Sequence, residues 1–312
     1  MNGGYLMEKI EIRPFCPILE IEALLVLWNR IFPHDSTTLF DLNELIFCGE
    51  GLDLSLCLLA WKHKQMVGFV CAVVDDSRHD AYIHAIGVDD CLRNSGIGTR
   101  MLDTLENELS RRSIRKLIFS GYPNRYILPG LDDNCYPTGK LFLESKGFVS
   151  KTEVVSMEKF LVTVQTSEIE LSDLFKVIPF SDRFLGSVLQ LSRRMLHPEW
   201  VDTIRQAYIR TEGNCHGYVC VDMRGIVVGY AFFGMVGEDI CRFGPIGVDT
   251  AYRGKSIGKA LLLACLHEQQ KLGCSRSYFL WGEKKSPAVK MYSKAGFTVF
   301  RTMTIYEKLL NR

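Results

Sequence analysis

The sequence predicts an α/β protein (α+β by some schemes) in which one mixed fold of strands and helices is used twice in tandem. The chain has 312 residues, which is enough for two domains of ordinary size. A glycine-containing motif occurs in each half, and in each half the motif lies between a predicted strand and a predicted amphipathic helix. Since the next predicted strand returns parallel to the first, each half contains a βαβ unit.

The internal repeat is visible in two blocks of matching residues. Residues 86–89, Ile-Gly-Val-Asp, recur at 246–249, and residues 93–98, Arg-Asn-Ser-Gly-Ile-Gly, recur at 253–258 as Arg-Gly-Lys-Ser-Ile-Gly. Both blocks are offset by 160 positions. Because the order of the features is preserved along the chain, one structural unit has been used twice.

The elements of the first copy follow from hydrophobic periodicity and turn residues. We expect a strand at 9–15, helices at about 17–32 and 39–48, strands at 54–62, 65–75 and 81–88, a long helix at about 96–112, a strand at 116–121, a helix at 137–146 and a closing strand at 148–160. On the long helix Met101, Leu102, Leu105 and Leu109 recur at helical spacing, so one face packs on a sheet.

The second copy opens at Lys176, after a join at about 162–172, and its elements follow in the same order. The predicted domains are therefore 1–162 and 173–312. Each domain should bury its own core, because 47% of the residues are hydrophobic and 23% are charged.

Composition argues against several classes of function. The formal net charge is +1, so no global field favours nucleic acid or an anionic membrane. No apolar run approaches the roughly 20 residues that span a bilayer. The eleven cysteines are scattered without metal-ligand spacing, which favours reduced thiols and no metal site. A cytoplasmic protein is expected.

The turn before the long helix can hold an anion. Glycine at Gly96 and Gly98 lets backbone N–H groups approach a ligand, and the first turn of a helix carries unpaired donors and the positive end of the dipole. Arg93 and Arg253 could add charge-assisted contacts. The spacing is neither that of a Walker loop nor that of a Rossmann turn. A plain helix start, with glycines that serve only the turn, is the alternative.

These residues resemble the GCN5-related N-acetyltransferase (GNAT) superfamily, whose signature is Arg/Gln-x-x-Gly-x-Gly/Ala between a strand and a helix. The resemblance covers nearly the whole chain and implies two tandem domains, each with a mixed, mostly antiparallel twisted sheet, a splayed central strand pair and flanking helices. It also implies acetyl-CoA as co-substrate. The residues implied in binding it are Ile86, Gly87, Val88, Arg93, Asn94, Ser95, Gly96, Ile97, Gly98 and Thr99 in the first copy, and Ile246, Gly247, Val248, Arg253, Gly254, Lys255, Ser256, Ile257, Gly258 and Lys259 in the second.

A second signature of that superfamily, Tyr-x-x-x-Gly-Phe, is matched by residues 292–297. By resemblance Tyr292 is the general acid that protonates the departing thiolate of CoA. The first copy has Leu143 at that position, although its glycine turn is complete. The second copy keeps the tyrosine but has Ser256 where glycine is expected. The two copies are therefore not equivalent, and at most one is expected to be fully active.

A general base in this superfamily often lies on the strand before the glycine turn. His84 occupies that place, and histidine titrates near neutrality; a half-buried structural histidine is the alternative. The second copy has Gly244 there, which leaves Glu283 as its candidate base.

The loop 121–137 carries the aromatic residues Tyr122, Tyr126 and Tyr136 and the acidic pair Asp132 and Asp133. An amine acceptor could dock there, or the loop could be an ordinary solvated turn. Two arrangements stay open. Either the first copy catalyses, with water or Tyr136 as acid, or the second catalyses through Tyr292.

The function predicted is an acetyl-CoA-dependent N-acetyltransferase acting on a primary amine of a small molecule or peptide. The amine attacks directly and a tetrahedral intermediate collapses, since no nucleophile with an adjacent base is evident. The alternative is a non-catalytic acyl-CoA sensor or interaction module with one or both domains degenerate. The sequence leaves a homodimer open.

Overall fold

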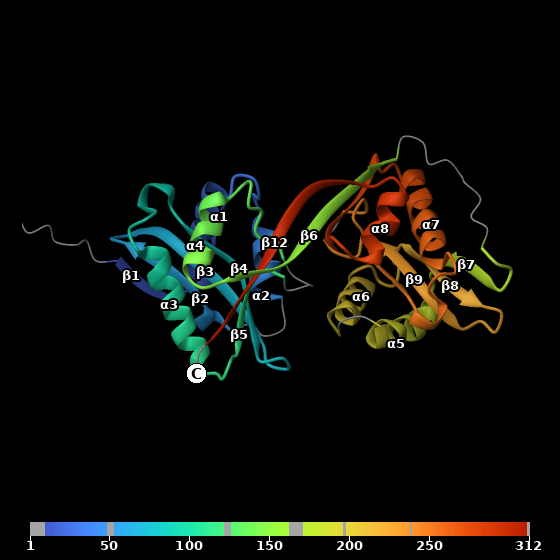
Figure 1. Cartoon of the computed structure of the whole chain (residues 1–312), viewed down its shortest axis with the longest axis horizontal. Helices are drawn as coiled ribbons and strands as arrows, with labels where there is room; N and C mark the ends of the chain where they lie inside the picture. The colour runs from blue at the N-terminus through green and yellow to red at the C-terminus, as the bar shows by residue number, and fades with distance from the viewer. Residues whose placement is uncertain are drawn as a thin grey trace, which may run out of the picture. The chain divides into compact units, whose positions relative to one another are not determined.

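The computed structural model describes residues 10–48, 53–121, 126–161, 171–195, 198–237 and 239–310. Its residues fall into two compact units (Figure 1). The first unit holds the residues up to Val154 together with those from Met303 onward, and the second unit holds Val155–Thr302.

The first unit is built on the strands β1 to β5. These are β1 (Ile10–Pro14), β2 (Cys57–Lys62), β3 (Gln65–Asp75), β4 (Asp80–Val88) and β5 (Lys116–Phe119). The strands lie in the order β1-β2-β3-β4-β5, antiparallel except for the parallel pair β4 and β5. The strand expected at 54–62 is shorter than predicted, because Leu54–Leu56 form a 3₁₀ turn capped by the Asp53 carboxylate.

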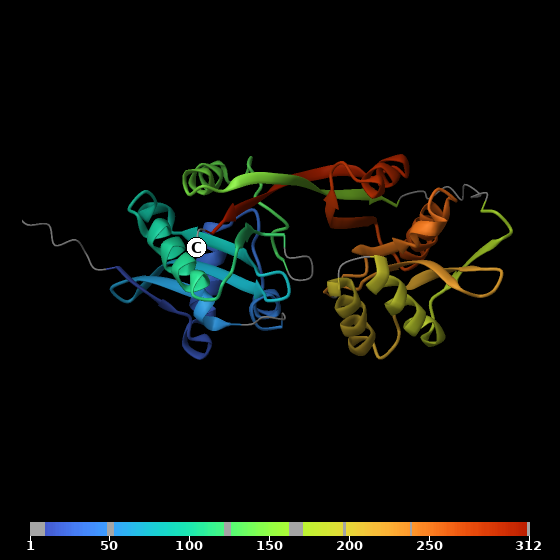
Figure 2. The same cartoon turned by 60° about the horizontal axis from the view of Figure 1, so that its bottom comes forward.

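Helices cover both faces of this sheet (Figure 2). They are α1 (Pro17–Ile31), α2 (Leu39–Phe47), α3 (Ile97–Ser110) and α4 (Pro137–Ser145). Leu24, Leu27 and Trp28 of α1 are buried in one cluster with residues of β2 and β3. α2 begins at a capping box in which Thr38 and Asp41 satisfy each other's backbone N–H groups.

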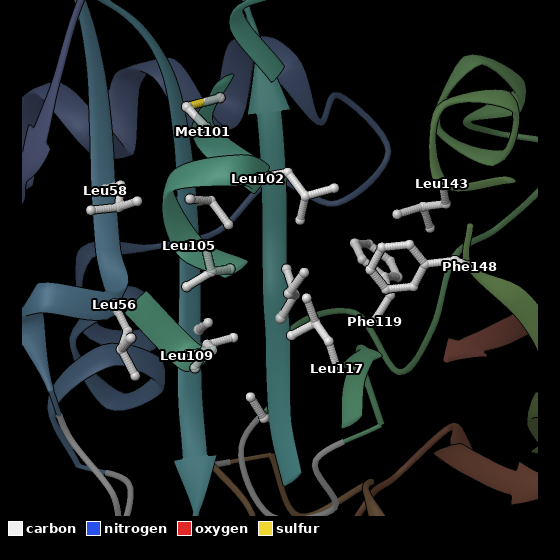
Figure 3. Close-up of a cluster of buried hydrophobic side chains, with 14 of the residues drawn as sticks. Leu56, Leu58, Met101, Leu102, Leu105, Leu109, Leu117, Phe119, Leu143 and Phe148 are labelled. Carbon is white, nitrogen blue, oxygen red and sulfur yellow. The ribbon is translucent and has the colours of Figure 1, made fainter. Parts of the chain in front are cut away.

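The apolar face predicted for the long helix is confirmed. Met101, Leu102, Leu105 and Leu109 of α3 are all at most 1% exposed, and they join Leu58 of β2 and Leu117 of β5 in one core (Figure 3). This packing fixes the helix against the sheet. The N-terminus of α3 is thereby held at the end of β4.

The second unit repeats this order of elements. Its strands are β7 (Phe175–Pro179), β8 (Gly217–Asp222), β9 (Val227–Phe233), β10 (Phe243–Val248) and β11 (Arg276–Glu283). Its helices are α5 (Leu185–Met195), α6 (Pro198–Arg210), α7 (Ile257–Lys271) and α8 (Pro287–Lys294). The two domains predicted from the repeat are present as folds.

The strands β6 (Val149–Phe160) and β12 (Thr298–Leu309) are each divided between the units. The end of β12 pairs antiparallel with β5, from Tyr306 opposite Phe119 to Leu309 opposite Lys116. The end of β6 lies beside β11, where Ser156 Oγ donates to the carbonyl oxygen of Leu280 at 2.9 Å. The closing strand of each unit therefore comes from the other copy.

The compact units differ accordingly from the ranges 1–162 and 173–312. Each of the two strands has 12 residues, about 40 Å when extended, which is far longer than the four-residue β5. Both strands carry four consecutive buried residues at their middle. Because the two strands have the same pattern of buried residues, each could close the sheet of either unit. The local sequence therefore does not decide which strand pairs with which sheet.

Candidate acetyl-CoA site

The candidate site of the first unit begins where β4 and β5 separate. Their parallel pairing runs only from Asp80 opposite Lys116 to Ile83 opposite Phe119, and it ends with the N–H of Ser120 donating to the carbonyl oxygen of Ile83 at 2.7 Å. β4 continues to Val88 without that neighbour. One edge of Ile86, Gly87 and Val88 is thus left open.

A β-bulge lies at the point of separation. Cys71 of β3 is opposite Ala85, whereas the next residue, Ala72, is opposite Ile83, so His84 is the extra residue on β4. A bulge bends its strand and increases the local twist. The second unit has the same irregularity between Phe243 and Ile246, which contains Gly244.

The glycine turn follows directly. Asn94 and Gly96 both have left-handed backbones, with φ of 61° and 83°, and α3 begins at Ile97 without a side-chain cap. The first-turn N–H groups therefore lack intrahelical acceptors. Arg93 forms an ion pair with Asp90 at 2.5 Å.

An ion pair anchors the start of this turn in both units. Arg30, in the last turn of α1, lies 2.5 Å from Asp89, which follows β4. In the second unit Arg194 of α5 lies 3.3 Å from Asp249. The two units therefore also share an ion pair between a helix and the residue that follows a strand, which the glycine motif alone did not indicate.

A cavity of about 650 Å³ occupies the gap between β4, the turn and α4. It brings together most of the first-copy residues predicted to bind acetyl-CoA, together with parts of α1, the 126–136 loop and α4. Its lining is mainly apolar and consists of Ile31, Phe32, Ile86, Gly87, Val88, Leu92, Arg93, Asn94, Gly96, Ile97, Gly98, Thr99, Phe119, Leu128, Gly130, Leu131, Tyr136, Thr138, Gly139, Leu141, Phe142, Leu143, Ser145 and Lys146.

Tyr136 lines this cavity at the N-terminus of α4. Its hydroxyl donates to Oδ2 of Asp35 at 2.6 Å, and its ring packs edge-on against Phe32 and His34. The hydroxyl hydrogen is thus directed at a carboxylate. Leu143, at the position matched to Tyr292, also lines the cavity and is buried.

His84 is 5% exposed and does not line the cavity. Burial lowers the pKa of its imidazole to about 4, so the ring is neutral at pH 7. Tyr126 belongs to the loop 126–136 but is not among the residues that line the cavity, and Tyr122 falls outside the described residues. Asp132 is buried and accepts the N–H groups of Asn134 and Cys135, which makes it a turn residue.

The corresponding region of the second unit is packed with aromatic rings. Tyr292 is 6% exposed, with ring centroids 4.6 Å from Phe279, 5.7 Å from Phe297 and 6.0 Å from Phe243. Burial raises the pKa of its phenol well above 10. Only three residues join β11 to α8, whereas 17 residues join β5 to α4.

The glycine turn of the second unit has the same backbone shape. Gly254 and Ser256 have φ of 78° and 61°, so a serine stands in the left-handed conformation that glycine has in the first unit. Lys255 lies 5.5 Å from the ring centroid of Phe175 and 5.2 Å from that of Tyr252. Glu283 is exposed at the end of β11.

Sequence reasoning missed Asp35, Ile31 and Phe32. These residues reach the site from the end of α1, about 100 positions before Tyr136 in the chain. The Phe-Pro-His-Asp segment at 32–35 ends a helix and reads as an ordinary turn. No local signal there indicates a partner for a distant tyrosine.

Among the residues that the structure describes, no helix combines the length and apolar character needed to cross a membrane. No group of three or more histidine, cysteine, aspartate or glutamate side chains gathers there as a metal site would require.

Comparison with known proteins gives a similar protein and several similar folds. Over 82 residues the chain is 29% identical to a mycothiol acetyltransferase of Corynebacterium glutamicum (strain R). The matched segment covers 26% of this chain and 28% of that protein's length. The match thus spans well under half of that relative.

Solved structures resemble nearly the whole chain at low identity. A GCN5-related N-acetyltransferase from Sphaerobacter thermophilus aligns with a TM-score of 0.70 and 17% identity, covering 97% of this chain and 96% of the other. A tandem GNAT protein from the clavulanic acid biosynthesis pathway aligns with a TM-score of 0.72 and 14% identity, covering 97% and 99%. At these identities the likeness concerns the fold.

The model of the acetyltransferase (GNAT) family matches the chain twice, at residues 21–125 and 185–297. These two ranges fall on the two units and include both glycine turns. The repeat, the splayed strands and the matches together lead to one conclusion: the chain belongs to the acetyltransferase (GNAT) family, as a tandem two-domain member.

Proposed function

We propose that this protein transfers an acetyl group from acetyl-CoA to a primary amine, and that the reaction takes place in the first unit. The observation that carries the proposal is the 650 Å³ cavity, which joins the open edge of β4 and the glycine turn to the hydroxyl of Tyr136. The residues proposed to bind acetyl-CoA and the hydroxyl proposed to transfer the proton therefore line the same cavity.

The residues present fit acetyl-CoA. The unpaired N–H groups of the first turn of α3 suit its pyrophosphate, and Lys146 and Arg93 bring positive charge to the lining. The open backbone of Ile86–Val88 offers groups to the amide-containing pantetheine arm. The apolar lining then excludes water from the thioester.

Tyr136 and Asp35 are the proposed proton carriers. The tyrosine hydroxyl donates to the carboxylate, and in the proposed step its oxygen accepts a proton from the attacking amine while its own proton moves to Asp35. The C–N bond forms and the C–S bond breaks. The same pair then returns the proton to the sulfur of the departing CoA.

This role differs from the acid expected for Tyr136 alone. A tyrosine that gave its proton directly to the thiolate would become an anion 2.6 Å from a carboxylate, which Coulomb repulsion disfavours. Relay through Asp35 avoids that state. His84 enters no step of the scheme, because it lies outside the cavity lining.

A matched pair of variants distinguishes the two units. Gly98 and Gly258 occupy equivalent positions in the first turns of α3 and α7. A valine at position 98 would narrow the cavity at the first turn of α3, where the pyrophosphate is proposed to lie, so Gly98→Val should weaken acetyl-CoA binding more than tenfold by isothermal titration. Gly258→Val should leave the binding measured in this way unchanged.

The non-catalytic alternative is tested by release of CoA. The intact protein is incubated with acetyl-CoA and a panel of small-molecule and peptide amines, and free thiol is measured. Amine-dependent release supports the transferase. Tight binding without release on any amine would leave the sensor as the better description.

A further inference from the structure

The loop that walls one side of the cavity is held by the last strand of the chain. Leu131 and Thr304 of β12 form an isolated antiparallel bridge. The N–H of Leu131 donates to the carbonyl oxygen of Thr304 at 2.9 Å, and the N–H of Thr304 donates to that of Leu131 at 2.7 Å. Two short backbone bonds therefore join the loop to β12.

The loop also lies directly on the strand. A Cβ atom at Gly130 would stand 2.9 Å from the carbonyl oxygen of Thr304 and 3.2 Å from Cβ of Met303. Only a glycine permits this approach without movement of one backbone. Because Gly130 and Leu131 line the cavity, the position of β12 sets the position of that wall.

A side-chain contact extends the attachment toward α4. Tyr306 is 1% exposed, and its hydroxyl lies 3.2 and 3.3 Å from the two carboxylate oxygens of Asp133. Lys140 of α4 lies 3.3 Å from the same carboxylate. Burial and the Asp133 charge raise the pKa of Tyr306 to about 12, which keeps the phenol protonated as a donor.

We infer that Thr304 and Tyr306 are positioning residues for the amine side of the cavity, the wall formed by Leu128, Gly130, Leu131 and Tyr136 where the attacking amine would bind. They hold the loop 126–136, and with it Tyr136, at the distance from β4 that the reaction requires. The inference rests on the proposed function for its kinetic consequence. Residues 303–309 of β12 do not line the cavity themselves, and they thereby support one wall of a site whose lining comes from residues 31–146.

The first test needs no activity. In the full chain, Tyr306→Phe removes the hydroxyl and keeps the ring, and amide hydrogen exchange is followed by mass spectrometry. We expect exchange in peptides covering 126–136 to quicken about three- to tenfold, as loss of one hydrogen bond of ordinary net strength predicts, with α3 unchanged. Glu307→Gln is the control, because Glu307 lies on the same strand and pairs with Lys151 at 3.0 Å.

The second test is kinetic. Tyr306→Phe and Gly130→Ala should each raise KM for the amine about three- to tenfold, while the dissociation constant of acetyl-CoA stays within twofold of the wild type. A structural role alone would affect both substrates. Faster loop exchange with an unchanged amine KM would overturn the inference, and so would faster exchange spread evenly over the first unit.

Failure of the proposed transferase function and failure of this inference give different experimental results. If the protein transfers no acetyl group, the exchange experiment still reports whether Tyr306 holds the loop, and an unchanged loop would refute the inference independently of activity. If the protein is active and the loop exchange is unchanged in both variants, the transferase proposal stands and the inference does not.

Discussion

The hydroxyl of Tyr136 lies 2.6 Å from Oδ2 of Asp35, a residue 101 positions earlier in the chain. One partner ends the loop that walls the cavity, and the other follows the end of α1. This contact connects the two sides of the cavity and gives the site a hydroxyl with a proton acceptor. It is the arrangement on which the proposed chemistry depends.

Removal of either partner should slow the chemical step. Tyr136→Phe and Asp35→Asn each interrupt the proton path, so we expect kcat to fall by about a hundredfold, within the usual range for general acid–base groups. The dissociation constant of acetyl-CoA, measured by titration, should stay within twofold. Because the pair acts as one unit, the double variant should be little worse than either single variant. Additive losses would contradict a relay.

Tyr292→Phe distinguishes the two units by their chemistry. The phenol of Tyr292 is enclosed by three phenylalanine rings, and its pKa is raised by burial. With the reaction in the first unit, the variant should keep kcat within about twofold, and its melting temperature should stay the same or rise slightly. A loss of kcat beyond tenfold would instead place the reaction in the second unit.

His84 should make the first unit sensitive to acid. Its pKa is about 4 in the folded chain, against 6.5 for the free group. Between these values the unfolded state binds the proton and the folded state does not, so stability falls as pH drops from 6.5 toward 4. The full effect is about 3 kcal/mol. Urea unfolding followed across this range should show the loss.

The matched variant is His84→Gln, which cannot titrate in this range. Its unfolding midpoint should depend less on pH between 6.5 and 4 than that of the wild type. An identical pH dependence in both proteins would assign the acid sensitivity to other groups.

The left-handed residues of the two glycine turns predict opposite effects of substitution. Gly96 has φ of 83° and open space around its Cβ position, so Gly96→Ala should cost about 1 kcal/mol through backbone strain alone. Ser256 has φ of 61°, so Ser256→Gly should relieve a similar strain in the second unit. The thermal unfolding of each variant, together with amide hydrogen exchange followed separately in α3 and in α7, would measure the two changes in stability. A stabilised Gly96→Ala protein would be incompatible with this conformation.

Much of the fold followed from local patterns. The apolar positions of α3, the strands before it and the glycine turn were predictable because side-chain periodicity and turn residues are properties of short segments. The order of the repeat then fixed the tandem architecture. The boundaries of the units were not predictable, because β6 and β12 carry equivalent buried segments and only their pairing partners distinguish them.

The candidate site divides in the same way. The proposed donor side, from Ile86 to Thr99, is contiguous in sequence and could be predicted from the motif. The proposed amine side is assembled from Phe32, Asp35, Leu131 and Tyr136, which meet only through tertiary packing.

By itself the sequence determined that this chain has two copies of one α/β fold, that each copy presents a helix N-terminus after a strand, and that the copies have diverged at Leu143 and Ser256. Only the tertiary structure decided which strand closes each sheet, that Tyr292 is enclosed by rings, and that Tyr136 meets Asp35. The physical reason is that helices, strands and turns are set by neighbouring residues, whereas strand exchange and the lining of a cavity depend on contacts between segments far apart in the chain.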